Sequence, residues 1–236
     1  NDILTVGASS GNVGIGTASP EEQLTITKNF RLSPTTHENL NGIIYKDGNR
    51  FIHDFNYGYS GSTTTVGQNT FIGINAGNLT MGEGVISPFQ ASYNVGVGAS
   101  AFTSNTSGNY NTAVGASSLY SNTSSANNTA VGYYALYFNT SGISNTALGS
   151  YALYNNTSGN SNTALGYHAF YNNKTGSTNV AVGINAGMLD ASSQPLIGST
   201  NSIFLGGSTK AQSNDQTNQI VIGVNAIGAG SNSVVL

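Results

Sequence analysis

The chain has 236 residues, of which 6 % are charged, whereas roughly a quarter are charged in an average globular protein. A formal net charge of −3 argues against nucleic acid as a partner, because no basic surface is available to displace counterions from phosphates. No apolar run reaches about 18 residues, so we expect no membrane insertion of this segment. Thirteen Tyr and nine Phe argue against disorder in so polar a chain.

Residues 1–65 carry most of the charge and differ in composition from the rest of the chain. Within them, Asp47-Gly48 separates the apolar runs Ile43–Tyr45 and Arg50–His53. An Asp-Gly pair between apolar runs predicts a β-hairpin. We therefore expect a small β-rich neck or connector over 1–65, followed by a repeat domain over 66–236.

A 17-residue motif recurs through the middle of the chain. Its first residue is an asparagine in each unit: Asn94, Asn111, Asn128, Asn145, Asn162 and Asn179. Self-similarity at a short fixed period predicts a solenoid, in which each unit is one rung that stacks on the next. The expected fold class is therefore all-β, a parallel β-roll or β-solenoid of 17-residue rungs.

Each unit is centred on a glycine that follows a large aliphatic residue. The glycines are Gly73, Gly98, Gly115, Gly132, Gly149, Gly166, Gly183, Gly206 and Gly223. In the unit of Thr129 to Val131, the β-branched and the aliphatic residue share one face of a strand, and we expect the aliphatic one to point inward. Ala130 between them would let another surface approach closely. Ala135 and Leu136 predict a second short strand, so that each rung reads strand, bend, strand, turn, with no helix.

The 17-residue period is broken twice. Excess residues fall near 79–92, where we expect a loop around Met81 to Gln90, and near 188–199, where the loop should run over Asp190 to Leu196. Insertions in solenoids usually emerge on one face, which is often the binding face.

The sequence offers no convincing catalytic, cofactor or metal site. Residues 84–173 contain no Asp, Glu, Lys or Arg, so the paired carboxylates that glycoside hydrolysis requires are missing there. Asp47 and Asp54 flank His53, but hairpin surfaces often carry such residues. His37, His53 and His168 are far apart, and the Asp-rich nonapeptides of calcium-binding rolls are absent. We read His168 as a surface or interface residue, although copies of one histidine could meet on the axis of a trimer.

Tyrosines recur at one position of the rung: Tyr120, Tyr137, Tyr154 and Tyr171. Rungs of a parallel sheet lie roughly 4.8 Å apart, so these rings should stack into a column. The column can be structural, holding rungs or subunits together, or it can be a glycan-contact strip, because sugars stack on aromatic faces.

Asparagines also recur in the turns, within Asn-x-Ser/Thr sequences at Asn105, Asn122, Asn139 and Asn156. The pattern matches a glycosylation acceptor, but turn formation explains it equally well. Asparagines stacked in successive rungs can also form hydrogen bonds to one another.

A rung of 17 residues encloses little apolar volume and leaves alanines and tyrosines facing outward. Association of several copies would bury that surface. The sequence therefore predicts an oligomer of unspecified number.

Two segments, Asn218–Ala226 (NQIVIGVNA) and Ser231–Leu236 (SNSVVL), resemble the head repeat of trimeric autotransporter adhesins. That family forms a left-handed parallel β-roll of three chains, so the resemblance implies a left-handed homotrimer, here with longer turns. Gly11–Pro20 followed by Leu24–Ile26, together with Asn69–Asn78, resembles motifs of phage tail fibres and related bacterial surface proteins.

The resemblance implies a non-enzymatic fibre or adhesin segment of a phage or phage-like tail fibre, which mediates attachment to a host surface or acts as a spacer. Its partners would be copies of itself and a cell-surface glycan or protein receptor. Its location would be a virion tail fibre or the extracellular cell surface. A bacterial cell-surface trimeric adhesin is one alternative. A solenoid that binds ice or crystal surfaces, suggested by flat uncharged Thr and Asn arrays, is another.

Overall fold

The computed structural model describes residues 43–53, 66–79 and 87–236, together with the backbone of five short strands outside them. The chain divides into two compact units, Asn1–Ser33 and Pro34–Leu236. The first unit holds a three-stranded sheet in the order β1 (Leu4–Val6), β2 (Val13–Ile15), β3 (Leu24–Ile26). In the second unit, β6 (Tyr59–Ser60) and β7 (Thr63–Thr64) form an antiparallel pair.

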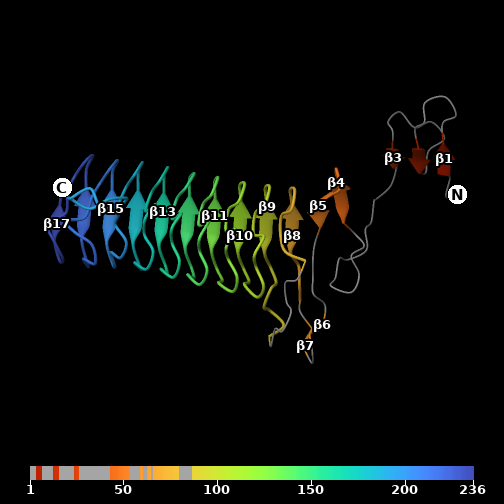
Figure 1. Ribbon diagram of the computed structural model, residues 1–236, viewed down its shortest axis with the longest axis horizontal. Coiled ribbons are helices and arrows are strands. Elements are labelled where there is room, and N and C mark those ends of the chain that lie inside the picture. The colour runs from red at the N-terminus through yellow and green to blue at the C-terminus, as the bar shows by residue number, and fades with distance from the viewer. Residues whose placement is uncertain are drawn as a thin grey trace. The chain divides into compact units, whose positions relative to one another are not determined.

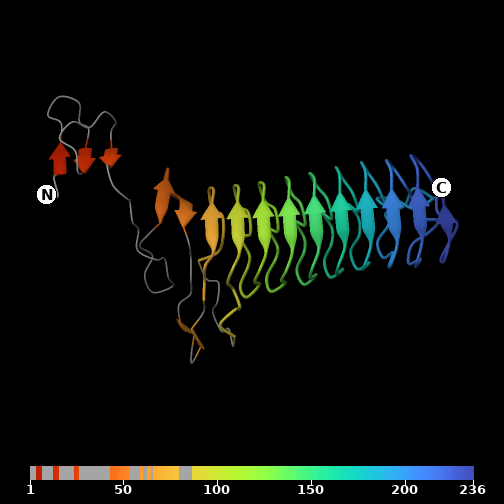
Figure 2. The same ribbon diagram turned by 180° about the vertical axis from the view of Figure 1, so that it is seen from behind.

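The second unit is a parallel β-solenoid, and its described residues contain no helix, as the repeat predicts (Figures 1 and 2). Each rung contributes one short strand to a single sheet. These strands are β8 (Thr70–Ile72), β9 (Val95–Val97), β10 (Thr112–Val114), β11 (Thr129–Val131), β12 (Thr146–Leu148), β13 (Thr163–Leu165), β14 (Val180–Val182), β15 (Ile203–Leu205), β16 (Ile220–Ile222) and β17 (Val234–Val235). All of them pair in parallel, each with the strand of the next rung.

The predicted hairpin forms and caps one end of this stack. It consists of β4 (Ile44–Lys46) and β5 (Asn49–His53), and β5 pairs antiparallel with β8. Arg50 Nη2 also donates a hydrogen bond to the carbonyl of Gly77, at 3.1 Å, which ties the hairpin to the first rung. The hairpin thus belongs to the same compact unit as the roll, although we assigned it to a separate neck over 1–65.

The prediction that the aliphatic strand residue points inward is wrong. In β12, Ala147 is fully buried, whereas Leu148 is 43 % exposed. The same pattern holds in β13, where Ala164 is the buried residue. A rung with a single strand is narrow, and Leu153 from the following turn fills the space behind that strand. Only a methyl group fits beside it, so the aliphatic and β-branched residues form the outer face of the sheet.

The predicted second strand does not form. The segment after each bend glycine is a turn, in which residues with positive φ alternate with ordinary ones: φ is 57° at Tyr134 and 50° at Leu136. Such values are unusual for bulky residues, and they prevent the extended backbone of a strand. Hydrogen bonds between rungs hold this shape, since the Tyr134 N–H donates to Ala116 O at 3.1 Å and the Leu136 N–H donates to Ala152 O at 3.0 Å.

The bend glycines allow the rungs to stack closely. Gly132 has φ of 139°, and a Cβ there would lie 2.5 Å from the carbonyl oxygen of Gly149 in the next rung. Both the backbone conformation and the distance require glycine.

A column of buried asparagines runs through the core at the start of the strands, and it consists of Asn69, Asn94, Asn111, Asn128, Asn145, Asn162 and Asn179. The Oδ1 of Asn111 accepts hydrogen bonds from the backbone N–H and the Nδ2 of Asn128, at 3.0 and 3.2 Å. The Asn128 Nδ2 also donates to the carbonyl of Gly142, at 2.9 Å. This column joins successive rungs through side-chain hydrogen bonds.

A second ladder runs through the turns and consists of Asn105, Asn122, Asn139, Asn156 and Asn173. For example, the Nδ2 of Asn156 donates to Asn139 Oδ1 at 2.8 Å and to Gly159 O at 3.0 Å. The ladder stops where Leu196 replaces the asparagine of the next rung, so the Asn173 Oδ1 has no hydrogen-bond partner among the residues that the structure describes. Because the members that carry the Asn-x-Ser/Thr pattern are fully buried, none of them is open to glycosylation in the folded roll.

The two insertions differ in how much of them is described. Residues 80–86, at the centre of the first insertion, lie outside the described residues. The second insertion folds back on itself, with Leu189 bridging Pro195. The buried Asp190 holds it, because its Oδ1 accepts hydrogen bonds from the N–H groups of Ser192 and Gln194, both at 2.9 Å.

Candidate binding surfaces

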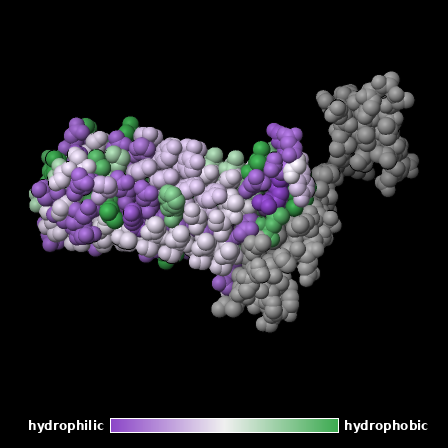
Figure 3. All heavy atoms as spheres, in the orientation of Figure 1, coloured by the Kyte–Doolittle hydropathy of each residue, from purple (hydrophilic) through white to green (hydrophobic). Residues whose placement is uncertain are grey.

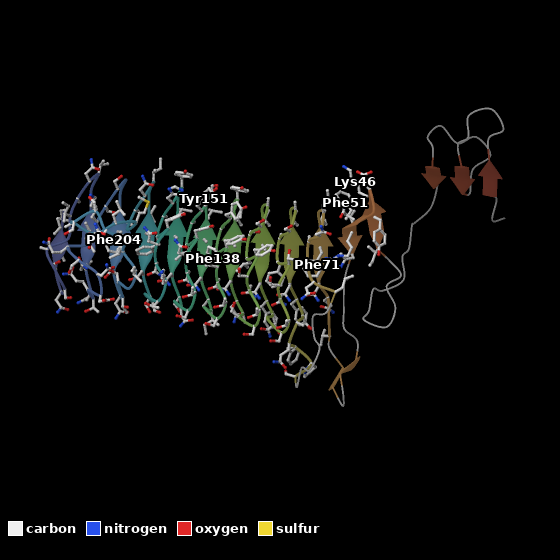
Figure 4. All side chains as sticks on the ribbon, in the orientation of Figure 1. Lys46, Phe51, Phe71, Phe138, Tyr151 and Phe204 are labelled. Carbon is white, nitrogen blue, oxygen red and sulfur yellow. The ribbon has the colours of Figure 1, made fainter. Side chains whose placement is uncertain are left out.

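Ten rings gather on the part of the roll that follows β10 to β13, and we call this surface the aromatic face. Its members are Tyr120, Tyr133, Tyr134, Tyr137, Phe138, Tyr151, Tyr154, Tyr167, His168 and Tyr171. Tyr151 marks its position beside the bends where the strands end (Figure 4).

The four tyrosines that recur every 17 residues form a stacked column on this face. Ring centroids lie 5.0 Å apart for Tyr120 and Tyr137, 5.4 Å for Tyr137 and Tyr154, and 5.1 Å for Tyr154 and Tyr171. Interplanar angles are 9 to 19°, so the rings cover one another's faces. Burial and the neighbouring phenols raise the pKa of Tyr137 and Tyr154. Because neighbouring rings of the column are in contact, a ligand cannot insert between them without separating rungs.

A second group of rings lies next to the column, immediately after the bend glycines. Tyr133 is 47 % and Tyr167 is 48 % exposed. Each of them is perpendicular to the Tyr151 ring, at 89°. A hydrogen bond between Tyr133 and Tyr134 raises the pKa of Tyr134. These positions are not aromatic in every rung, so the 17-residue period does not reveal the group, although the paired aromatics of GYYALY and GYHAFY are visible in the repeat.

The histidines are dispersed. His168 stacks on Tyr167, with ring centroids 3.8 Å apart. Burial lowers the pKa of His168, and a hydrogen bond with Asn185 raises it by a smaller amount. His53 is buried against Phe71, and its Nε2 lies 2.8 Å from the carbonyl oxygen of Ala76. His37 and Asp54 lie outside the described residues, and Asp47 sits in the hairpin turn.

The described residues bring no three His, Cys, Asp or Glu side chains together as metal ligands. Nor does the described part of the chain contain a helix long and apolar enough to cross a membrane.

A pocket of about 270 Å³ adjoins the aromatic face, and it is lined by Asn185, Met188, Leu189, Ser208, Lys210 and Asn225. Asn185 continues the ring group by one rung, since its N–H donates to Tyr167 O at 2.9 Å. Lys210 Nζ reaches Ser193 Oγ at 3.3 Å, so the second insertion borders the pocket.

The outer face of the sheet carries a continuous row of aliphatic side chains, which we call the aliphatic stripe. It consists of Ile72, Val97, Val114, Val131, Leu148, Leu165, Val182, Leu205 and Ile222, and all of them are half-buried or exposed. A row of β-branched residues, four of them threonines from β10 to β13, runs beside it. In the view of Figure 3 the middle of the roll is mostly pale, whereas stronger purple and green appear toward the C-terminal end.

The chain matches no protein-family model, no curated protein and no solved structure. A functional assignment therefore starts from the surfaces described above.

Proposed function

We propose that the chain is a non-enzymatic structural segment of a phage or phage-like tail fibre. In this proposal it forms a homotrimer that attaches to a host surface or acts as a spacer on the virion. The single observation that carries this proposal is the aliphatic stripe, which runs along nine rungs on the outside of the sheet.

The stripe is suited to contact with another copy of the same chain. It contains no charged residue, and its side chains recur once per rung, so two copies can match each other rung for rung. Burying an exposed aliphatic side chain of this size stabilises association by about 1 kcal/mol, because the effect scales with apolar area at roughly 25 cal/mol per Å². Nine weak contacts in one row then add up to a long interface, and obligate interfaces are apolar in this way.

Three copies, rather than two, are supported by the resemblance of Asn218–Ala226 and Ser231–Leu236 to the head repeat of trimeric adhesins. The same resemblance makes a bacterial cell-surface trimeric adhesin the alternative, which differs in location and not in assembly.

Light scattering on a size-exclusion column tests the assembly. We expect a mass near three times 24.2 kDa for the intact chain. The double variant Leu148→Lys/Leu165→Lys should give a monomer, because it puts two charges on the stripe. Ile143→Lys is the matched control, since Ile143 is 46 % exposed but lies in a turn and not on the stripe. A monomeric intact chain, or a double variant that keeps the mass, would overturn the proposal.

One further observation favours a second candidate. Thr112, Thr129, Thr146 and Thr163 form a regular row beside the aliphatic stripe, and such a flat array could bind an ordered surface such as ice. A thermal-hysteresis assay distinguishes the two: the fibre proposal expects no activity, whereas activity that disappears in Thr146→Tyr would favour the surface binder.

A further inference from the structure

The aromatic face is local, whereas the aliphatic stripe is not. The stripe runs along nine rungs, but the aromatic residues of the face all lie between Tyr120 and Tyr171. An interface between parallel copies would repeat along the whole roll. A cluster limited to a few rungs instead has the dimensions of a binding site for one ligand.

Tyr133 and Tyr167 are the most exposed rings of this face. Tyr133 and Tyr167 are outside the stacked column, and about half of each side chain is exposed. They occupy the same position two rungs apart, which is roughly 9.6 Å at about 4.8 Å per rung. The rung between them carries only Ser150 at that position, and its Oγ is hydrogen-bonded to Tyr133 O at 3.3 Å. The Tyr151 ring of that rung lies 5.4 Å from Tyr133 and 6.3 Å from Tyr167, centroid to centroid, so the surface between the two rings is aromatic and uncharged.

The adjoining pocket supplies polar groups in the neighbouring row, because Asn185 follows Tyr151 and His168 at the second position after the bend glycine. Asn185, Ser208 and Asn225 offer amide and hydroxyl groups, and Lys210 offers up to three N–H donors.

We propose that the aromatic face and this pocket bind one extended glycan chain. Two sugar rings of the chain stack on Tyr133 and Tyr167, because the C–H face of a pyranose packs on an aromatic ring, and their spacing is close to the length of a disaccharide unit. The next sugar enters the pocket, where its hydroxyls bond to the side chains of Asn185 and Ser208. Among the described residues that line the pocket, Lys210 is the charged one, so it favours an acidic sugar there over a basic one. This inference rests on the attachment role proposed above and names the ligand class.

The test uses the intact chain and an array of purified bacterial capsular and O-chain polysaccharides, followed by calorimetry with oligosaccharides of the strongest hit. Tyr133→Ala and Tyr167→Ala should each weaken binding about five- to tenfold, which is the worth of one aromatic contact. Tyr110→Ala is the matched control and should stay within about twofold, because Tyr110 is 47 % exposed and stacks on Tyr93 outside the aromatic face.

Three outcomes overturn the glycan proposal: no polysaccharide binds, both variants bind as well as the intact chain, or both variants change the mass by light scattering. The last outcome would assign the aromatic face to contact between copies. Glycan binding by an intact chain that is monomeric would support this site and refute the trimer, so the two proposals fail separately.

Discussion

Replacing one asparagine of the core ladder with alanine should destabilise the roll more than the small change in side-chain size suggests. Asn145 is fully buried, and its side chain takes part in four hydrogen bonds. Its Nδ2 donates to Asn128 Oδ1 at 3.3 Å and to Gly159 O at 2.8 Å. Its Oδ1 accepts from the backbone N–H and the Nδ2 of Asn162, at 3.0 and 3.2 Å.

The Asn145→Ala variant loses all four hydrogen bonds but does not leave every partner unsatisfied. Asn156 Nδ2 still donates to Gly159 O, and Asn162 Nδ2 still donates to Gly176 O. The backbone N–H of Asn162 is the group that loses its only acceptor. One buried unsatisfied donor costs about 1–3 kcal/mol and each of the three further lost bonds about 0.5–1 kcal/mol, so we expect a loss of about 2.5–6 kcal/mol in the free energy of unfolding.

Chemical denaturation followed by circular dichroism measures the global loss, and hydrogen exchange measures the local one. Because repeat proteins can unfold rung by rung, exchange of the Asn162 amide is the sharper readout. A local loss of about 3 kcal/mol should accelerate it more than 100-fold. The control is Asn155→Ala, which removes a single half-buried hydrogen bond of 3.4 Å to Asn172. If Asn155→Ala and Asn145→Ala destabilise the protein equally, the ladder is not what holds the core.

Two further predictions concern the bends and the pH dependence. Gly149→Ala should lower the free energy of unfolding by about 3 kcal/mol or more, because φ is 138° and the new Cβ would lie 2.5 Å from Gly166 O. Gly207→Ala is the control and should be nearly neutral in thermal unfolding, because its Cβ would meet no atom closer than 3.8 Å. Burial lowers the pKa of His168, so its protonation favours the unfolded chain. Stability should therefore fall as the pH drops below about 6.5, the ordinary histidine value, and His168→Tyr should remove that part of the dependence in paired unfolding profiles. Identical profiles for both proteins would refute the role of His168.

The 17-residue period was enough to predict the solenoid and the rung boundaries, and the Asp47-Gly48 pair between apolar runs was enough to predict the hairpin. The period was not enough to predict which strand face is inside. Thr129 to Val131 alternate, and hydrophobicity alone favours burying the valine, but Leu136 fills the interior of that rung and leaves room only for Ala130. The informative signal was Asn128, which lies on the same face as Ala130 and is equally constant across the middle rungs.

The turns and the exposed rings were harder to predict for a different reason. Nothing in Leu136 or Tyr134 indicates positive φ, which arises from hydrogen bonds between rungs and not from the residues themselves. The column at Tyr137 and Tyr154 could be predicted because it repeats in every middle rung. Tyr133 was missed because exposed positions are free to vary, so a local site need not follow the period that reveals the fold.

The parallel register between rungs makes the length of the roll a matter of whole numbers. Thr129 pairs with Thr146 as Thr146 pairs with Thr163, so the upper surface of one middle rung is equivalent to that of the next. Loss or duplication of 17 residues would rejoin matching surfaces and change the length by one step of roughly 4.8 Å. The antiparallel hairpin covers the edge of the sheet at β8, so rungs are gained or lost between β8 and the C-terminal end of the roll. A gene that encodes this roll can thus set the reach of the protein by counting units, without redesigning any contact between them.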